Sequence, residues 1–248
     1  MESLKIVALT TVSILFVIAG LYIVVPYVVK LLIKRKLSFY ITKENSVYLT
    51  FDDGPDPEAT PQILEMLDKY NARATFFAIG AKIEKYPDIV STILKSGNSI
   101  GSHGYRHLHG WKATPFSMLR DLKKEREILA KYFSSERQIL YRPPFGKLNL
   151  INLFYYLRRN GKIVFWDCDP EDYKAASPDQ IADYILENVR PGSIILLHDG
   201  RSKEENNSAD VTVKALELIL RGLSDLKFEC VTIEEGIKKT KAPTLPVN

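Results

Sequence analysis

The longest apolar stretch of the chain lies near its amino-terminal end. Residues Ile6 to Val29 include no charged side chain and consist mainly of Val, Ile, Leu and Ala. A helix of this length rises roughly 36 Å, which is enough to cross a hydrocarbon core of about 30 Å. A cleaved signal peptide usually has a shorter apolar core followed by small residues. We therefore predict an uncleaved single-pass membrane anchor with a basic flank over residues 1–36.

Beyond residue 45, short apolar runs alternate with amphipathic segments. The apolar runs predict strands, and the segments between them predict helices because their apolar residues recur at helical spacing. The predicted strands are 46–51, 74–79, 99–102, 138–141, 162–167, 192–197 and 228–233, and the predicted helices are 61–70, 88–95, 115–133, 148–158, 178–188 and 210–223. Seven strands alternating with helices indicate a parallel α/β fold, for which we expect a closed or nearly closed barrel.

The strands and helices make one domain, which begins near residue 46 and follows the anchor over 1–36 and a connector over 37–45. A domain of this size has room for a full hydrophobic core. Its two cysteines, Cys168 and Cys230, both fall in apolar runs, and we expect buried thiols rather than a disulfide.

The net charge belongs to the anchor and not to the domain. Residues 1–36 hold five basic and one acidic side chain, which accounts for the whole net charge of +4, and residues 37–248 hold 29 of each sign. The basic pI therefore gives no support for nucleic-acid binding. We expect no nucleic-acid partner and no obligate protein partner.

Polar residues follow five of the predicted strands. In parallel α/β folds the ligand site lies beyond the carboxyl ends of the strands. The first strand is followed by Asp52 and Asp53, the third by His103, the fourth by Arg142, the fifth by 167–173 and the sixth by His198. We expect these groups to converge on one face of the barrel.

The histidines indicate a metal site. The chain has four, and His103, His107 and His109 fall within seven residues. A spacing of four places His103 and His107 on one side of a helical turn, and two histidines with a carboxylate leave a position open for water, as in catalytic zinc sites. Alone, such a pair is more often two surface histidines on a turn, but the nearby Asp52 and Asp53 favour a metal. We expect His109 not to be a ligand.

The remaining polar groups suggest acid and base chemistry. Adjacent carboxylates at an apolar strand end repel each other unless cations compensate them, although Asp-Asp-Gly-Pro is also an ordinary turn sequence. A metal on one aspartate and Arg142 on the other would compensate both. His198 is either a core histidine or a general acid, oriented by a carboxylate such as Asp172.

Together these motifs resemble the polysaccharide deacetylases of carbohydrate esterase family 4, the NodB-homology domain, which include chitin and peptidoglycan N-acetylglucosamine deacetylases. The first motif is complete in Thr50–Pro55, the third in Arg142–Gly146 and the fifth in Leu196–Asp199. The resemblance implies a catalytic domain over 46–239, followed by a tail over 240–248. It also implies a distorted (β/α) barrel of about seven strands and a single divalent metal, usually zinc.

The resemblance also implies a role for each matching residue. The implied metal ligands are Asp53, His103 and His107; the implied catalytic residues are the base Asp52, its partner Arg142, the acid His198 and, behind it, Asp172; and the implied substrate contacts are the Phe145 N–H on the oxyanion, Leu196 beside the acetyl methyl and Tyr173 in the groove wall.

The chain departs from the family pattern in two places. Gly104 and Leu108 stand where the second motif has a hydroxyl residue and proline, and Gly104 lacks a hydroxyl that helps to shape the metal loop. Tyr173 stands where the fourth motif ends in tryptophan. The first departure affects the geometry of the loop, and the second affects the choice of substrate.

These features predict a hydrolase that removes N-acetyl groups from amino sugars in a cell-wall or chitin-like polysaccharide and releases acetate. One alternative is a deacylase or deformylase of a polyprenyl-linked amino sugar at the membrane, and another is a catalytically decayed glycan-binding module. Four basic residues follow the apolar run, which favours a cytoplasmic domain. Because the family's usual substrates lie outside the cell, we nevertheless expect an extracytoplasmic domain on the membrane anchor.

Overall fold

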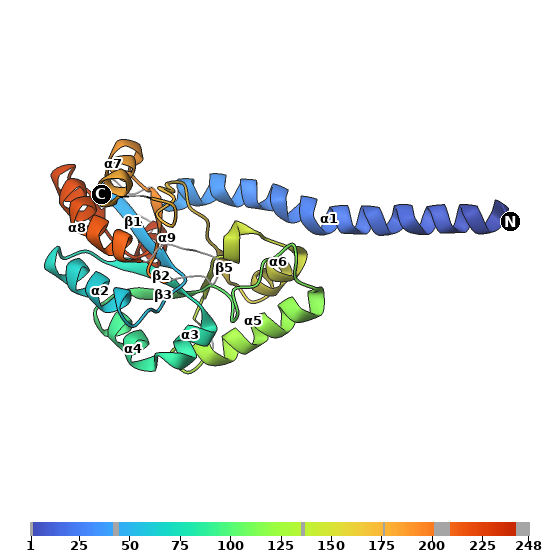
Figure 1. Cartoon of the computed structure of the whole chain (residues 1–248), viewed down its shortest axis with the longest axis horizontal. Coiled ribbons are helices and arrows are strands. Elements are labelled where there is room, and N and C mark those ends of the chain that lie inside the picture. The colour runs from blue at the N-terminus through green and yellow to red at the C-terminus, as the bar shows by residue number, and fades with distance from the viewer. Residues whose placement is uncertain (1, 42–44, 135–136, 176, 201–208, 242–248) are drawn as a thin grey trace, which may run out of the picture.

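The computed structural model describes residues 2–41, 45–134, 137–175, 177–200 and 209–241. Helices and strands alternate along most of this length (Figure 1). The strands are β1 (Ser46–Asp52), β2 (Ala74–Ala78), β3 (Ser99–Ser102), β4 (Leu140–Tyr141), β5 (Lys162–Ile163), β6 (Ile194–His198) and β7 (Glu229–Cys230). The helices are α1 (Glu2–Ile41), α2 (Ala59–Lys69), α3 (Gly80–Lys85), α4 (Pro87–Lys95), α5 (Pro115–Leu129), α6 (Leu150–Leu157), α7 (Pro178–Asn188), α8 (Asp210–Asp225) and α9 (Ile233–Lys241), with a 3-10 turn at Pro144–Gly146.

The strands form a parallel sheet that curls into an incompletely closed barrel. Their order is β5-β4-β3-β2-β1-β6, and β7 pairs with the start of β1. Beyond β5 the chain leaves β4 and crosses to β6, where Cys168 bridges Ile195. The expected strand over 162–167 therefore pairs with β4 only over its first two residues. The predicted distorted barrel of parallel strands is confirmed.

The alternation of side chains along β1 and β6 separates the barrel interior from the outer core. Val47, Leu49 and Phe51 point outward and join the apolar layer beneath α2, α7 and α8. The intervening residues point inward, where Tyr48 packs with the inward side chains of other strands. The interior apolar cluster consists of Tyr48, Phe77, Leu140, Val164, Ile194, Ile233 and Ile237, the last two from α9. It fills the amino-terminal end of the barrel.

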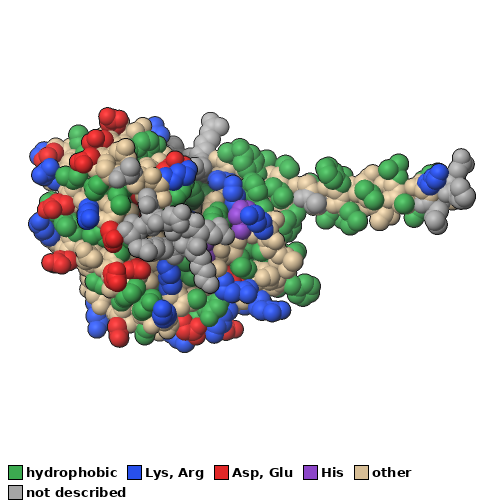
Figure 2. All heavy atoms as spheres, viewed as in Figure 1, with side chains coloured by type: hydrophobic (Ala, Val, Ile, Leu, Met, Phe, Trp, Pro, Cys, Tyr) green, Lys and Arg blue, Asp and Glu red, His purple; other side chains and the backbone are tan. Residues whose placement is uncertain are grey.

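Helix α1 projects far beyond the domain (Figure 1). Lys5–Ile33 is long and apolar enough to cross a membrane. Only 6% of its most apolar 18-residue segment is buried in the structure. Large apolar side chains cover the projecting part (Figure 2). The helix continues to Ile41, so the expected connector over 37–45 is mostly helical, and its residues 42–44 lie outside the described residues. Near its carboxyl end α1 contacts α6 and α9, and Val29 and Ile33 pack on the apolar cluster around α5 and α6.

Two helices were not predicted from the sequence. Helix α3 is only six residues long, and α9 begins at Ile233, at the end of an expected strand. Because α9 runs to Lys241, the helix passes the expected domain boundary at 239, and residues 242–248 of the expected tail lie outside the described residues. Both cysteines are free thiols, as expected, but Cys230 is only partly buried.

Candidate active site

Asp52 and Asp53 reach the same site because the backbone turns sharply between them. Asp52 ends β1 and points into the barrel with Thr50, two residues earlier. In a continuing strand the next side chain would point to the opposite face. Asp53 instead has φ of 72°, in the left-handed region, which brings its carboxylate back to the carboxyl end of the barrel. The next residue, Gly54, must lack a side chain, because a Cβ there would lie 2.1 Å from Asp199 Oδ2.

His103 and His107 lie on a loop and not on a helical turn, so that part of the prediction is wrong. The segment after β3 contains no helix, and the φ angles of Gly104 and His107 are +79° and +57°. These left-handed residues break the helical path and still bring both imidazoles to Asp53. His109 is not one of the three clustered residues, and its Nδ1 accepts the backbone N–H of Trp111.

Helix α5 supports this loop with two buried carboxylates one turn apart. Asp121 accepts the backbone N–H groups of Tyr105 and Arg106 at 2.8 and 3.2 Å. Glu125 accepts the Ser102 hydroxyl at 2.6 Å. A Cβ at Gly104 would meet Asp121 Oδ2 at 3.3 Å, so this carboxylate lies beside the position where the family has a hydroxyl residue. The Asp121 carboxylate thus holds the loop after β3, which lacks that hydroxyl at Gly104.

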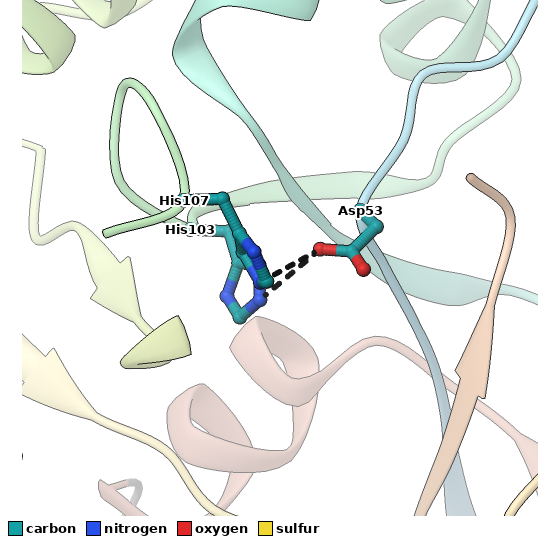
Figure 3. A group of neighbouring side chains, drawn as sticks. All are labelled: Asp53, His103 and His107. Atoms are coloured by element: carbon teal, nitrogen blue, oxygen red, sulfur yellow. Dashed lines mark ion pairs between the residues drawn. The ribbon is translucent and has the colours of Figure 1, made fainter. Parts of the chain in front are cut away.

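Asp53, His103 and His107 together form a set that fits a divalent cation (Figure 3). Their ligand atoms all lie within 4.8 Å of one another. Asp53 Oδ1 is 3.1 Å from His107 Nε2 and 3.5 Å from His103 Nε2. Two imidazole nitrogens and a carboxylate oxygen are a donor set typical of catalytic zinc, which keeps an open coordination position.

The protonation of His103 also suits a metal ligand. Its Nδ1 lies 2.8 Å from the Arg142 carbonyl oxygen, an acceptor that assigns the proton to Nδ1 and leaves the Nε2 lone pair towards Asp53. Burial, together with nearby His107, lowers the pKa of His103 well below its usual value. The neutral imidazole that a cation needs is therefore the favoured form.

Arg142 is fully buried and holds Asp52. Its Nη1 donates to Asp52 Oδ1 at 2.7 Å and to the Thr50 hydroxyl at 2.8 Å. The guanidinium also lies over the ring of Phe77, 4.1 Å from the ring centroid. Burial raises the pKa of Asp52 to about 6, against the opposing effects of Arg142 and His198. A carboxylate with a pKa near neutrality is suited to accept and return a proton.

His198 lies next to Asp52 on the paired strand. The two residues are register partners on β6 and β1, as are Thr50 and Leu196. His198 Nδ1 lies 2.6 Å from Asp172 Oδ1, and Asp172 Oδ2 accepts the backbone N–H of His198 and the Thr212 hydroxyl. Burial disfavours the imidazolium, but Asp172 outweighs this and raises the pKa of His198 to about 10. The imidazolium form of His198 is therefore favoured.

A cavity of about 200 Å³ joins these groups at the carboxyl end of the barrel. Its walls include the three predicted substrate-contacting residues, Phe145, Tyr173 and Leu196. Phe145 has φ of 56°, and its ring lies 4.5 Å from that of His107 between centroids. In the same turn, the N–H groups of Gly146 and Lys147 donate to the carbonyls of Pro143 and Pro144, whereas among the described residues the Phe145 N–H has no such acceptor. All ten residues predicted for the site thus come together at this end.

Sequence reasoning missed Trp166 as part of the cavity wall. Its indole Nε1 donates to Asp169 Oδ2 at 2.8 Å, and both residues line the cavity. The signal was present, because Val164 points into the barrel and Trp166 lies two residues further along the same face. Asp199 was quoted within a motif but given no role. It is buried, accepts the Thr60 hydroxyl at 2.6 Å, and burial raises its pKa to about 7.

Comparison with known proteins agrees with this arrangement. The family model described as polysaccharide deacetylase matches residues 40–159. A peptidoglycan-N-acetylglucosamine deacetylase of Bacillus cereus is 34% identical over 198 residues, which cover 79% of this chain and 89% of that protein. A chitooligosaccharide deacetylase of Bradyrhizobium is 30% identical, with coverage of 76% and 89%. 

The fold agrees as well. The crystal structure of the Bc1960 peptidoglycan N-acetylglucosamine deacetylase in complex with 4-naphthalen-1-yl-N-oxidanyl-benzamide superposes with a TM-score of 0.72 at 34% identity. The match covers 79% of this chain and 90% of that one. Sequence, fold and site geometry lead to one conclusion: this chain belongs to the polysaccharide deacetylase family.

Proposed function

We propose that this protein is a membrane-anchored, metal-dependent deacetylase that removes N-acetyl groups from N-acetylglucosamine in a cell-wall or chitin-like polysaccharide and releases acetate. One observation carries the proposal. Asp52 and the protonated His198 are register partners on adjacent strands, beside the buried set of Asp53, His103 and His107. A base and an acid beside a cation site are the groups that amide hydrolysis requires.

The metal ligands would be Asp53, His103 and His107, and zinc is the cation that we propose. When bound, the cation would polarise the acetyl carbonyl and lower the pKa of water. Asp52 accepts a proton from the water that attacks the carbonyl carbon, while Arg142 keeps this carboxylate in place. The N–H of Phe145 donates to the oxyanion that forms, and Leu196 contacts the acetyl methyl group.

His198 completes the reaction. As the tetrahedral carbon collapses, the bond between carbon and nitrogen breaks, and His198 donates its proton to the departing nitrogen. The products are acetate and a free amino sugar. Asp172 keeps the imidazole protonated and oriented towards the cavity, and Tyr173 forms part of the wall that the sugar would meet.

The site of action would be a membrane surface. Helix α1 supports an anchor by its length and its exposed apolar side chains, and we propose that the catalytic domain lies outside the cytoplasm. A lipid-linked amino sugar is the second candidate substrate, and one contact favours it. Lys30, at the end of the apolar run, donates to the carbonyl oxygen of Gly146, beside the cavity residue Phe145.

Acetate release by the full chain tests the proposal. The protein in detergent micelles is loaded with zinc and given N-acetylglucosamine oligomers, peptidoglycan or a polyprenyl-linked N-acetyl amino sugar. We expect release from the polysaccharides that disappears with a chelator and in the variant Asp53→Ala, whose zinc content should also fall. Folded, zinc-loaded protein that acts only on the lipid-linked sugar would favour the second candidate, and protein that acts on none would refute the deacetylase.

The variant His198→Gln tests the assignment of the acid. Loss of the acid should abolish release from the amide, because an amine leaves only when protonated. An aryl acetate ester has a leaving group that needs no proton, so its hydrolysis should be much less affected. Equal losses on both substrates would show that His198 does not protonate the leaving group.

A further inference from the structure

The carboxyl end of the barrel, where the active site lies, is also the end that is nearer to the projecting half of α1. Lys30 lies beside this end, where its Nζ donates to Gly146 and sits 5.0 Å from the ring centroid of Phe165. The helix then runs on to Ile41, shortly before β1 starts at Ser46 at the opposite end. The apolar run before Lys30 therefore extends away from the domain on the side of Gly146, the neighbour of the cavity residue Phe145.

Exposed aromatic and basic side chains gather at the rim of this end. Trp111 and Phe145, in the segments after β3 and β4, are each 38% exposed, and Phe116, in the first turn of α5, is 84% exposed. Lys147 Nζ lies 4.5 Å from the Trp111 ring centroid, and Lys112 is exposed beside it. We call these five residues, Trp111, Lys112, Phe116, Phe145 and Lys147, the rim patch.

The apolar exposure extends from the rim patch along α6. Phe154 and Leu157 are 52% and 58% exposed on a helix that contacts α1. Helices α5 and α6 form the side of the domain towards which the free half of α1 extends (Figure 1). A soluble surface has little reason to expose so many large apolar groups close together, beside an apolar helix.

The balanced charge of the domain hides a strong asymmetry. Residues 105–166, which contain the rim patch, α5 and α6, hold 13 basic and four acidic side chains. Of these, the basic Arg142 and the acidic Asp121 and Glu125 are buried. Residues 167–248 hold ten basic and 16 acidic side chains. Most Asp and Glu side chains in view lie towards the end away from α1 (Figure 2). Basic residues with aromatic and leucine side chains are the composition that binds anionic bilayer surfaces.

We propose that the rim patch rests on a lipid bilayer containing anionic lipids, so that the active-site cavity lies at the level of the lipid head groups. The inference rests on the membrane anchor of the proposed function, because α1 brings this end of the barrel to the surface. It adds that the domain is held against the bilayer and does not swing free. The site would then act on amino sugars that lie at the membrane surface.

Fluorescence quenching by brominated lipids tests this contact directly. The full chain is reconstituted in vesicles of phosphatidylcholine and phosphatidylglycerol, with or without bromine on the acyl chains. The variant Trp166→Phe leaves Trp111 as the single tryptophan. At a depth of about 5–10 Å into the boundary of head groups and acyl chains, the Trp111 indole should lose most of its emission to brominated lipid.

Matched charge variants show whether the rim patch causes the quenching. Lys112→Glu with Lys147→Glu, in the Trp166→Phe background, should remove most of it, while Lys214→Glu on the exposed face of α8 should leave it unchanged. Flotation of each variant with the vesicles shows that α1 is still inserted. Floating protein whose Trp111 is not quenched, or whose quenching survives both glutamates, would overturn the proposal.

A sugar-binding role for the same aromatic residues is the alternative that the experiments must distinguish from bilayer contact. If Trp111→Phe raised KM for soluble N-acetylglucosamine oligomers and Trp111 were not quenched, the rim patch would be a glycan surface and the bilayer proposal would be wrong. Quenching does not depend on turnover. It can therefore succeed while acetate release fails, and the two proposals can be judged separately.

Discussion

The two ends of the barrel interior are built on the same strands from opposite kinds of residue. At the amino end, Tyr48 and its register partner Ile194 belong to an apolar cluster closed by α9. Two positions along are Thr50 and Leu196, and two further along are Asp52 and His198, buried and ionisable. Burying ionisable groups costs stability, and burying apolar groups provides it. The amino end of the barrel therefore stabilises the fold, and the ionisable groups buried at the carboxyl end lower that stability.

Cavity size alone would point to the wrong end. A larger cavity, of about 600 Å³, lies at the amino end, between the start of β3 and α9. Its walls include the ion pair of Arg137 and Glu234. The smaller cavity, at the carboxyl end, contains the candidate metal ligands and the proposed base and acid. The convergence of buried titratable groups, and not volume, distinguishes the candidate active site.

Asp52→Asn should have the largest effect. Asparagine keeps the shape of the side chain but cannot accept the proton of water, so turnover should fall about 10²–10⁴-fold while the zinc content is retained. Acetate release and elemental analysis of the same sample measure both. Near wild-type turnover in the variant would mean that Asp52 is not the base.

Ile194→Ala tests the apolar end of the same pair of strands. The side chain is 5% exposed, and its loss should lower the free energy of unfolding by about 2–5 kcal/mol. Turnover measured below the unfolding transition should stay close to that of wild type, since Ile194 touches none of the reacting groups. Urea unfolding followed by tryptophan fluorescence measures the change. A large loss of turnover in the folded variant would show that the two ends are not separable.

Asp121→Asn should weaken metal binding by loosening the loop that carries His103 and His107, although Asp121 is not itself a proposed ligand. The amide keeps one acceptor oxygen but loses the charge that binds the N–H groups of Tyr105 and Arg106, so zinc affinity should fall roughly 10–100-fold. Arg106→Gln is the matched control, because it removes the ion pair with Asp121 and leaves the backbone hydrogen bonds. Competition with a zinc chelator measures both variants. Equal losses would assign the effect to the ion pair.

Glu125→Gln should change how stability depends on pH. Burial raises the pKa of Glu125 to about 8 from an ordinary value of 4.5, against the opposing hydrogen bond from Ser102. Between these values the folded chain keeps a proton that the unfolded chain has lost. The contribution of Glu125 to the free energy of unfolding is therefore greatest below pH 4.5 and declines as the pH rises towards about 8. The decline is at most about 1.4 kcal/mol per pH unit.

The variant lacks this titration, so its unfolding free energy should fall less steeply with rising pH than that of wild type. Asp52 and Asp199 keep their own raised pKa values in both proteins, and the difference between the two curves isolates Glu125. Urea unfolding from about pH 5 to pH 8 supplies the curves. Parallel curves would show that Glu125 has no raised pKa.

The sequence predicted the strands and the end of the barrel that carries the site, because both depend on local patterns. Apolar runs of β-forming residues predict strands, and polar residues directly after them fall at their carboxyl ends. Asp52, Arg142 and His198 were placed in this way. The length of β5 was overestimated because the chain after Ile163 leaves β4 for β6, a change of partner that no local pattern indicates.

The rest depends on backbone angles and on tertiary contacts. A spacing of four suggested a helical turn for His103 and His107, but the left-handed angles of Gly104 and His107 produce a loop. Asp121 and Glu125 look like the polar face of an amphipathic helix. Only the packing of α5 under the metal loop shows that they are buried.

One paired measurement tests the division between the two ends most directly. The full chain, Asp52→Asn and Ile194→Ala are each loaded with zinc, and acetate release from N-acetylglucosamine oligomers is measured beside the free energy of unfolding. We predict that Asp52→Asn is folded, binds zinc and is inactive, and that Ile194→Ala is less stable and active. An active Asp52→Asn, or a folded Ile194→Ala that has lost its activity, would contradict the account.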